Sequence, residues 1–122
     1  MGMAMKVLLI EDDALLGMAM EDMFGDLGCE VVGVMSAYDA VVDVMERNPP
    51  DFALLDMNLN GASSVPIAQA LACRGVRVAF CTGYGNGSES LPEDLKDCVV
   101  LGKPVSEREL LTLLGLDSDV PA

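Results

Sequence analysis

The stretch MKVLLI, residues 5–10, opens the pattern that decides the fold. It is a short apolar run of the length of a buried strand, and it is followed by Leu16, Met20, Met23 and Leu27 at helical spacing. Gly28 then provides a residue type that commonly ends helices. The first 28 residues therefore predict one strand followed by one helix.

The same alternation continues to the end of the chain. Apolar runs predict further strands at residues 29–33, 51–55, 76–81 and 98–101, and helical stripes lie near residues 37–45, 65–72 and 107–114. Ser36 with Asp39, and Ser106 with Glu109, have the spacing of helix capping boxes. Strands that alternate with helices imply βαβ units, so we expect an α/β domain with a doubly wound, five-stranded parallel sheet.

The least regular segment runs from residue 83 to residue 96. It contains three glycines and Pro92, and its only large aliphatic residues are Leu91 and Leu95. A fourth helix in this segment should be short, late-starting and mobile.

Length and charge limit the classes of protein that fit. The 122 residues suffice for one domain, 1–122, and we expect no output domain. Twenty acidic residues against seven basic ones give a formal charge of −13, which disfavours binding to nucleic acid or to anionic membranes. No secretory signal or membrane-spanning stretch is apparent, so we expect a cytoplasmic protein.

The cysteine and histidine content excludes several kinds of site. The four cysteines form no C-x-x-C pair and there is no histidine, which rules out the usual zinc sites, Ser-His-Asp triads and Cys-His pairs. We expect the cysteines to be reduced and mostly buried.

Polar residues gather at one edge of the predicted sheet. Ligands of such sheets bind beyond the carboxyl ends of the strands, where the strand order switches. The residues that the strands deliver to this edge are Glu11, Asp12 and Asp13 from the first, Asp56 from the third, Thr82 from the fourth, and Lys103 with Pro104 from the fifth.

This set of side chains suits phosphoryl transfer. Carboxylates without histidine or cysteine select a hard cation, Mg²⁺ first and Mn²⁺ or Ca²⁺ next. A carboxylate can also attack phosphorus and form an aspartyl phosphate. The Lys103 ammonium and the Thr82 hydroxyl could neutralise charge on the phosphoryl group.

Four short motifs give this set a family resemblance. LLIEDD at residues 8–13, LLD at 54–56, TG at 82–83 and KP at 103–104 resemble the signatures of bacterial response-regulator receiver domains, which have the flavodoxin-like (βα)5 fold. Each motif is weak alone, but the four occur in order and at strand ends. The sequence FCTGY, residues 80–84, further resembles a divergent group of stand-alone receivers marked by a Phe-Ala-Thr-Gly motif, with Cys81 in place of the alanine.

The resemblance implies a role for each matching residue. Asp56 would be the phosphoacceptor and a ligand of Mg²⁺. Asp12 would bind Mg²⁺ directly, Glu11 would bind it through water or help to hold it, and the main-chain carbonyl of Asn58 would be the remaining protein ligand. Thr82 and Lys103 would contact the phosphoryl group. The bond from Lys103 to Pro104 would be cis. Asp13 matches a variable position and is not counted as a ligand.

One departure bears on the switch mechanism. Val100 stands where most receivers have an aromatic residue whose rotation reports phosphorylation. Tyr84 is the candidate to replace that aromatic residue. The divergent group implies a histidine kinase partner of the HWE type, or a phosphotransfer protein.

Three functions are compatible with this sequence. The first is a phosphorylatable response regulator that signals by protein–protein contact or acts as a phosphate sink, with slow self-dephosphorylation but no enzymatic output. The second is a receiver-like interaction module that does not use phosphate, which Val100 keeps open. The third is an aspartate-nucleophile phosphohydrolase, which is disfavoured because its acid/base aspartate would fall at Asn58.

Overall fold

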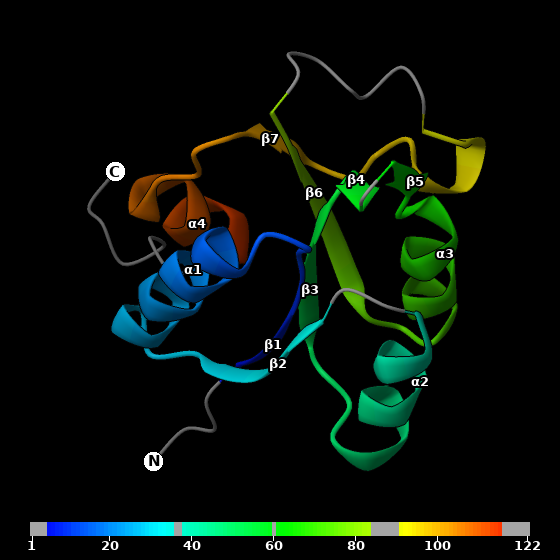
Figure 1. Cartoon of the computed structure of the whole chain (residues 1–122), viewed down its shortest axis with the longest axis horizontal. Helices are drawn as coiled ribbons and strands as arrows, with labels where there is room; N and C mark the ends of the chain where they lie inside the picture. The colour runs from blue at the N-terminus through cyan, green and yellow to red at the C-terminus, as the bar shows by residue number, and fades with distance from the viewer. Residues whose placement is uncertain (1–4, 36–37, 60, 84–90, 116–122) are drawn as a thin grey trace.

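The computed structural model describes residues 5–35, 38–59, 61–83 and 91–115. The elements follow one another as strand and helix along most of the chain (Figure 1). In chain order they are β1 Lys6–Ile10, α1 Ala14–Asp26, β2 Glu30–Met35, α2 Tyr38–Arg47, β3 Phe52–Asp56, β4 Asn58–Leu59, β5 Ala62–Ser63, α3 Val65–Cys73, β6 Arg77–Thr82, the 3-10 helix η2 Glu93–Leu95, β7 Val100–Gly102 and α4 Glu107–Leu114.

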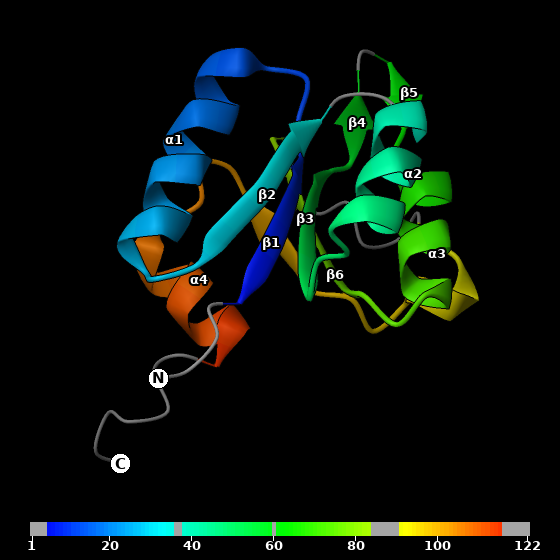
Figure 2. The same ribbon diagram turned by 90° about the horizontal axis from the view of Figure 1, so that it is seen from below.

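Five of the strands form one parallel sheet. Their order is β2-β1-β3-β6-β7, and every neighbouring pair runs in the same direction. Helices α1 and α4 cover one face, and α2 and α3 cover the other (Figures 1 and 2). The strand order reverses between β1 and β3, which is where ligands of such sheets bind. The doubly wound, five-stranded fold predicted from the sequence is confirmed.

The core consists of two apolar clusters, one on each side of the sheet. Strand β3 is buried along its whole length, and its residues alternate between the two clusters. Leu8, Ile10 and Phe80 pack with α2 and α3, whereas Val7, Leu9 and Cys81 pack with α1 and α4. The central strands are thus held from both faces, which fixes the positions of the residues at their carboxyl ends.

Helix ends follow the sequence signals closely. The Asp13 carboxylate caps α1 by accepting hydrogen bonds from the N–H groups of Leu15 and Leu16. Ser106 and Glu109 form the predicted capping box of α4. The predicted capping pair of Ser36 and Asp39 involves side chains outside the described residues.

Three features differ from the sequence expectations. A two-stranded antiparallel hairpin of β4 and β5 lies between β3 and α3 and was not predicted. The described part of segment 83–96 contains only the 3-10 turn Glu93–Leu95, anchored by the buried Leu95, and no α-helix; residues 84–90 lie outside the described residues. The cysteines are free, but the expectation that most are buried is wrong, because Cys73 is exposed and Cys29 and Cys98 are half-buried.

None of the described helices has the length and apolar character that crossing a bilayer requires.

Candidate functional site

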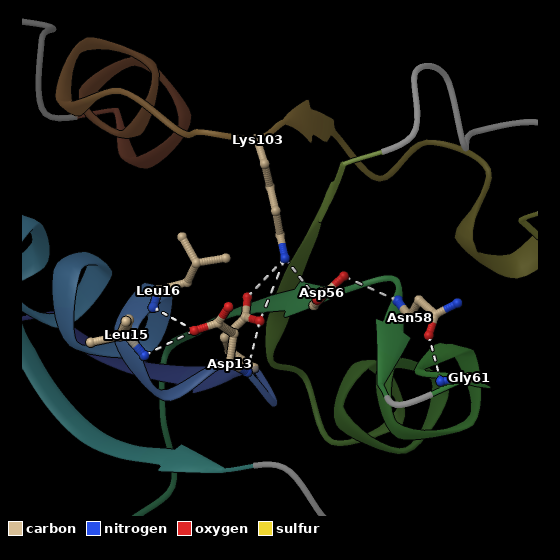
Figure 3. A network of polar contacts seen from close by, with 8 residues as sticks. Asp13, Leu15, Leu16, Asp56, Asn58, Gly61 and Lys103 are labelled. Carbon is tan, nitrogen blue, oxygen red and sulfur yellow. Dashed lines mark hydrogen bonds and ion pairs between the residues drawn. The ribbon is translucent and has the colours of Figure 1, made fainter.

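A polar pocket of about 390 Å³ lies at the carboxyl ends of the central strands. Figure 3 shows the end of the Lys103 side chain beside the Asp56 carboxylate at the end of β3. The residues that line the pocket come from four separate parts of the chain: Glu11, Asp12, Asp13, Leu16, Asp56, Asn58, Gly83 and Lys103. The topology therefore brings together residues that are more than ninety positions apart in sequence, as Glu11 and Lys103 show.

Asp56 is the last residue of β3 and is almost completely buried. Its Oδ2 atom lies 2.7 Å from the Lys103 Nζ atom, and its Oδ1 atom accepts a hydrogen bond of 3.1 Å from the N–H of Asn58. Strand β3 lies between β1 and β6, so the backbone of Asp56 is fixed from both sides. The carboxylate is thus held in one orientation at the base of the pocket.

Glu11 follows β1 directly, and its side chain is fully buried. Its Oε2 atom accepts a hydrogen bond of 3.1 Å from the N–H of Asp13, and its Oε1 atom lies 3.1 Å from Lys103 Nζ. Burial raises the pKa of the Glu11 carboxyl group, although the Asp13 N–H and Lys103 act in the opposite direction. The Asp13 N–H and Lys103 therefore offset only part of the effect that burial has on the pKa of the Glu11 carboxyl group.

Lys103 follows β7 and extends across the pocket between the two acids. Its backbone N–H donates to the carbonyl of Thr82, and its peptide bond to Pro104 is cis, as expected. Burial alone would lower the pKa of the Lys103 ammonium, but hydrogen bonds to Asp56 and Glu11 and their negative charges outweigh it and raise the pKa. Lys103 is consequently a permanent cation at this site.

The acidic side chains have the arrangement of a divalent-cation site. Oxygen atoms of Glu11, Asp12 and Asp56 all lie within 4.8 Å of one another. The buried Oε1 atom of Glu11 is paired with the Lys103 ammonium at 3.1 Å and accepts no hydrogen bond from the described part of the chain. An all-oxygen donor set of this kind fits a hard cation such as Mg²⁺ and can hold one.

Of the remaining candidate residues, one lines the pocket and the others do not or lie outside the described residues. Asn58 lines it, and its side-chain Oδ1 atom is occupied by a hydrogen bond of 2.7 Å from the Gly61 N–H. Thr82 ends β6 and is buried, but the neighbouring Gly83, not Thr82, lines the pocket. Val100 pairs with Phe80 in the sheet. Tyr84 lies outside the described residues.

Asp13 lies at the edge of the sheet where the sequence places it, but its capping of α1 and the position of Leu16 were not anticipated from the sequence. Asp13 caps α1 while it lines the pocket, and an aspartate directly before a helical stripe is a recognisable capping signal. Helical spacing groups Leu16 with Met20, Met23 and Leu27, but Leu16 does not join them in the apolar cluster beneath α1 and α4. It lies outside both apolar clusters and borders the pocket instead, because the first turn of α1 extends beyond the end of β1.

Cys81 is paired in register with Asp56 but takes no part in the polar cluster. Burial raises the pKa of its thiol to about 12, so the thiol stays protonated near neutral pH. Its side chain packs in the cluster beneath α1 and α4, where it acts as a small apolar group.

Comparison with known proteins agrees with the motifs and the fold. The response regulator receiver domain family matches residues 7–115, and the chain belongs to that family. Among curated proteins, the transcriptional regulatory protein PdtaR of Mycobacterium tuberculosis is 25% identical over 115 residues, covering 91% of this chain and 55% of PdtaR. The chain thus spans about half the length of the curated relatives it matches.

Solved structures include receivers of the divergent group. SdrG from Sphingomonas melonis Fr1 is 31% identical, with a TM-score of 0.77, over 94% of this chain and 97% of SdrG. The response regulator PhyR from Brucella abortus is 27% identical, with a TM-score of 0.73, over 92% of this chain and 46% of PhyR. A receiver domain of a modulated diguanylate cyclase from Desulfovibrio desulfuricans G20 is 26% identical, with a TM-score of 0.80, over 93% of each chain.

Proposed function

We propose that this chain is a phosphorylatable response regulator whose phosphoacceptor is Asp56. The single observation that carries the proposal is the buried Asp56 carboxylate, held 2.7 Å from the Lys103 ammonium in an open acidic pocket. A carboxylate that only stabilised the fold would not need a pocket with two further acids beside it. The phosphoryl donor is the phosphohistidine of a sensor histidine kinase, of the HWE type in particular, or of a phosphotransfer protein.

The reaction is an in-line displacement at phosphorus. A carboxylate oxygen of Asp56 attacks the phosphorus atom, the bond from phosphorus to the donor's imidazole nitrogen breaks, and an acyl phosphate forms. The Lys103 ammonium offsets negative charge on the phosphoryl oxygens, since it already lies against the Asp56 carboxylate. Thr82 is proposed to donate a hydrogen bond to the phosphoryl group and to move on activation, and Tyr84 is proposed to report that movement.

The ligands proposed for the metal are the carboxylates of Asp12, Asp56 and Glu11 and the main-chain carbonyl of Asn58. Mg²⁺ is the expected ion, with Mn²⁺ or Ca²⁺ as substitutes. When bound, the ion supplies positive charge that neutralises the phosphoryl oxygens. The three carboxylates of the cluster provide the negative charge that favours its binding.

The output proposed for this chain is a change in protein–protein contact, or competition for a kinase as a phosphate sink. The acyl phosphate is lost by slow hydrolysis, so the protein is a phosphoacceptor rather than an enzyme with its own substrate. We place this activity in the cytoplasm, within a single receiver domain. Support for a phosphate-dependent switch comes from SdrG, for which a BeF3-activated conformation has been solved at 31% identity to this chain.

A receiver-like interaction module that ignores phosphate is the alternative, and one observation favours it. Val100, in β7, cannot make the aromatic rotation that reports phosphorylation in most receivers. Both Asp56 and Lys103 are present and paired, however, and a module without phosphate chemistry would not require either residue.

Labelling with a small phosphodonor separates these functions. Acetyl phosphate with Mg²⁺ should add one phosphoryl group per chain, detected by intact-mass spectrometry, and Asp56→Asn should abolish the addition. Asp22→Asn, which removes an exposed carboxylate from α1, is the matched control and should label like the parent. No labelling of the parent would favour the interaction module, and labelling of Asp56→Asn at the parent's level would overturn the assignment of the acceptor.

A further inference from the structure

Leu16 differs from every other side chain of the Asp56 pocket. The described residues that line this pocket are polar, charged or glycine, apart from Leu16, whose side chain is aliphatic. Met20, Met23 and Leu27, on the same helical stripe, pack in the apolar cluster beneath α1 and α4. Leu16 belongs to neither cluster of the core and is half-buried. Its contribution to packing is therefore small, and its position calls for another explanation.

The backbone around Leu16 holds its side chain at the pocket. The Leu16 N–H donates to the Asp13 carboxylate that caps α1, at 3.1 Å. The next residue, Gly17, approaches Val34 so closely that an added Cβ would meet the Val34 side chain at 2.9 Å, and this contact holds α1 against β2. Figure 3 shows the side chains of Leu15 and Leu16 leaving this turn in different directions, and only Leu16 borders the pocket.

The Asp56 carboxylate is buried at the base of the open pocket and is reached through that pocket. Asp56 and Glu11 are buried, and the Lys103 side chain is 18% exposed. Any water that attacks a group attached to Asp56 must therefore enter the pocket whose wall includes Leu16. A hydrocarbon wall offers such a water no hydrogen bond, so it does not hold the water in place for attack.

We infer that Leu16 sets the lifetime of the phosphoryl group on Asp56 by limiting the access of water to it. This inference rests on the proposed function. In the step concerned, the oxygen of a water molecule attacks phosphorus, the bond between phosphorus and the Asp56 carboxylate oxygen breaks, and the products are the free carboxylate, inorganic phosphate and a proton released to solvent. Leu16 is a positioning residue in this step: it takes no part in forming or breaking a bond.

The test compares phosphoryl lifetimes in variants of two adjacent leucines. Parent, Leu16→Ala, Leu16→Met and Leu15→Ala proteins are labelled with acetyl phosphate and Mg²⁺, the donor is removed by desalting, and loss of the phosphoryl mass is followed over time. Leu15, which is 79% exposed and lies outside the pocket, is the matched control. We expect Leu16→Ala to shorten the lifetime by roughly three- to tenfold, a change of up to about 1.4 kcal/mol in the barrier.

The controls separate access of water from loss of structure. Leu16→Met restores a large apolar side chain and should return the lifetime to that of the parent, and Leu15→Ala should leave it unchanged. If Leu16→Ala does not fold, Leu16→Val serves in its place. Equal lifetimes in the parent and Leu16→Ala, or an equal shortening in Leu15→Ala, would overturn the inference and leave the proposed function standing. A parent that accepts no phosphoryl group would overturn both.

Discussion

The charged side chains at the two ends of the parallel sheet have different kinds of partner. At the amino end, cations are matched with neutral acceptors. The Lys6 Nζ atom donates to the Asn48 side chain at 2.9 Å, and the Arg77 Nη2 atom donates to the Leu113 carbonyl at 2.6 Å with its guanidinium group 5.8 Å from the Phe52 ring centre. At the carboxyl end, Lys103 is shared by two buried acids, and a third acid lies within reach.

The difference shows which end is built for binding. Polar groups satisfied by fixed partners, as at the amino end, stabilise the chain and need nothing further. A cluster with more carboxylates than cations repels itself, and it becomes favourable when a further cation binds. The comparison therefore indicates a structural role for the Arg77 end of the sheet and supports the binding role that we propose for the Asp56 end.

Removing the cation from the cluster should have the largest effect on stability. Lys103→Met leaves Glu11 and Asp56 buried without their counter-charge, and we expect the free energy of unfolding in metal-free buffer to fall by about 3 kcal/mol. Chemical denaturation measures this loss. Lys96→Met is the control, because Lys96 pairs with Glu93 at a similar distance, 2.6 Å, but both side chains are largely exposed. Its cost should stay below about 1 kcal/mol.

Equal losses in Lys103→Met and Lys96→Met would contradict the account of the cluster. Addition of Mg²⁺ should restore part of the stability lost in Lys103→Met, since the same carboxylates then receive a different cation. No such recovery is expected for Lys96→Met.

Metal binding should have the next largest effect. At a hundredfold excess over its dissociation constant, Mg²⁺ should stabilise the parent by about 2.7 kcal/mol. Asp12→Asn should reduce that gain while leaving the metal-free protein folded, because the change relieves repulsion within the acidic cluster. Thermal melts with and without Mg²⁺ measure both effects, with Asp22→Asn as the control. Identical melting of the parent in the two conditions, at saturating metal, would rule out a metal site.

A smaller loss of stability than that of Lys103→Met should come from a change at the amino end of the sheet. Arg77→Met removes the hydrogen bond to the Leu113 carbonyl and the contact with the Phe52 ring, for an expected loss of about 1–2 kcal/mol. Phosphoryl uptake from acetyl phosphate should remain at the parent's level. If a folded Arg77→Met protein took up less phosphoryl group than the parent, the amino end of the sheet would affect phosphorylation, and the separate roles of the two ends would be contradicted.

The strands and most helices could be predicted because their signals are local. Each signal marks one element and is found as expected. These signals are the apolar run at residues 5–10, the glycine at position 28 and the capping box of Ser106 and Glu109. The hairpin of β4 and β5 was missed because two-residue strands carry no periodic pattern. The last part of segment 83–96 forms a 3-10 turn rather than a helix, with little apolar surface beyond Leu95 to stabilise a longer one.

The sequence predicts those parts of the site whose positions follow from the topology of the sheet. Parallel strands deliver their carboxyl ends to one edge, so Glu11, Asp56 and Lys103 could be placed together from the order of the motifs alone. The position of Leu16 at the pocket could not be predicted, because helical spacing shows which residues share a face but not where the supporting strand ends. Only the structure shows that the first turn of α1 lies beyond the core.

The most direct test of the central claim is to locate the phosphoryl group chemically. After labelling with acetyl phosphate and Mg²⁺, reduction with borohydride converts an aspartyl phosphate to homoserine, which peptide mass spectrometry can assign to one position. The account predicts homoserine at position 56 in the parent and none in Asp56→Asn. Homoserine at another aspartate, or none in the parent, would contradict it.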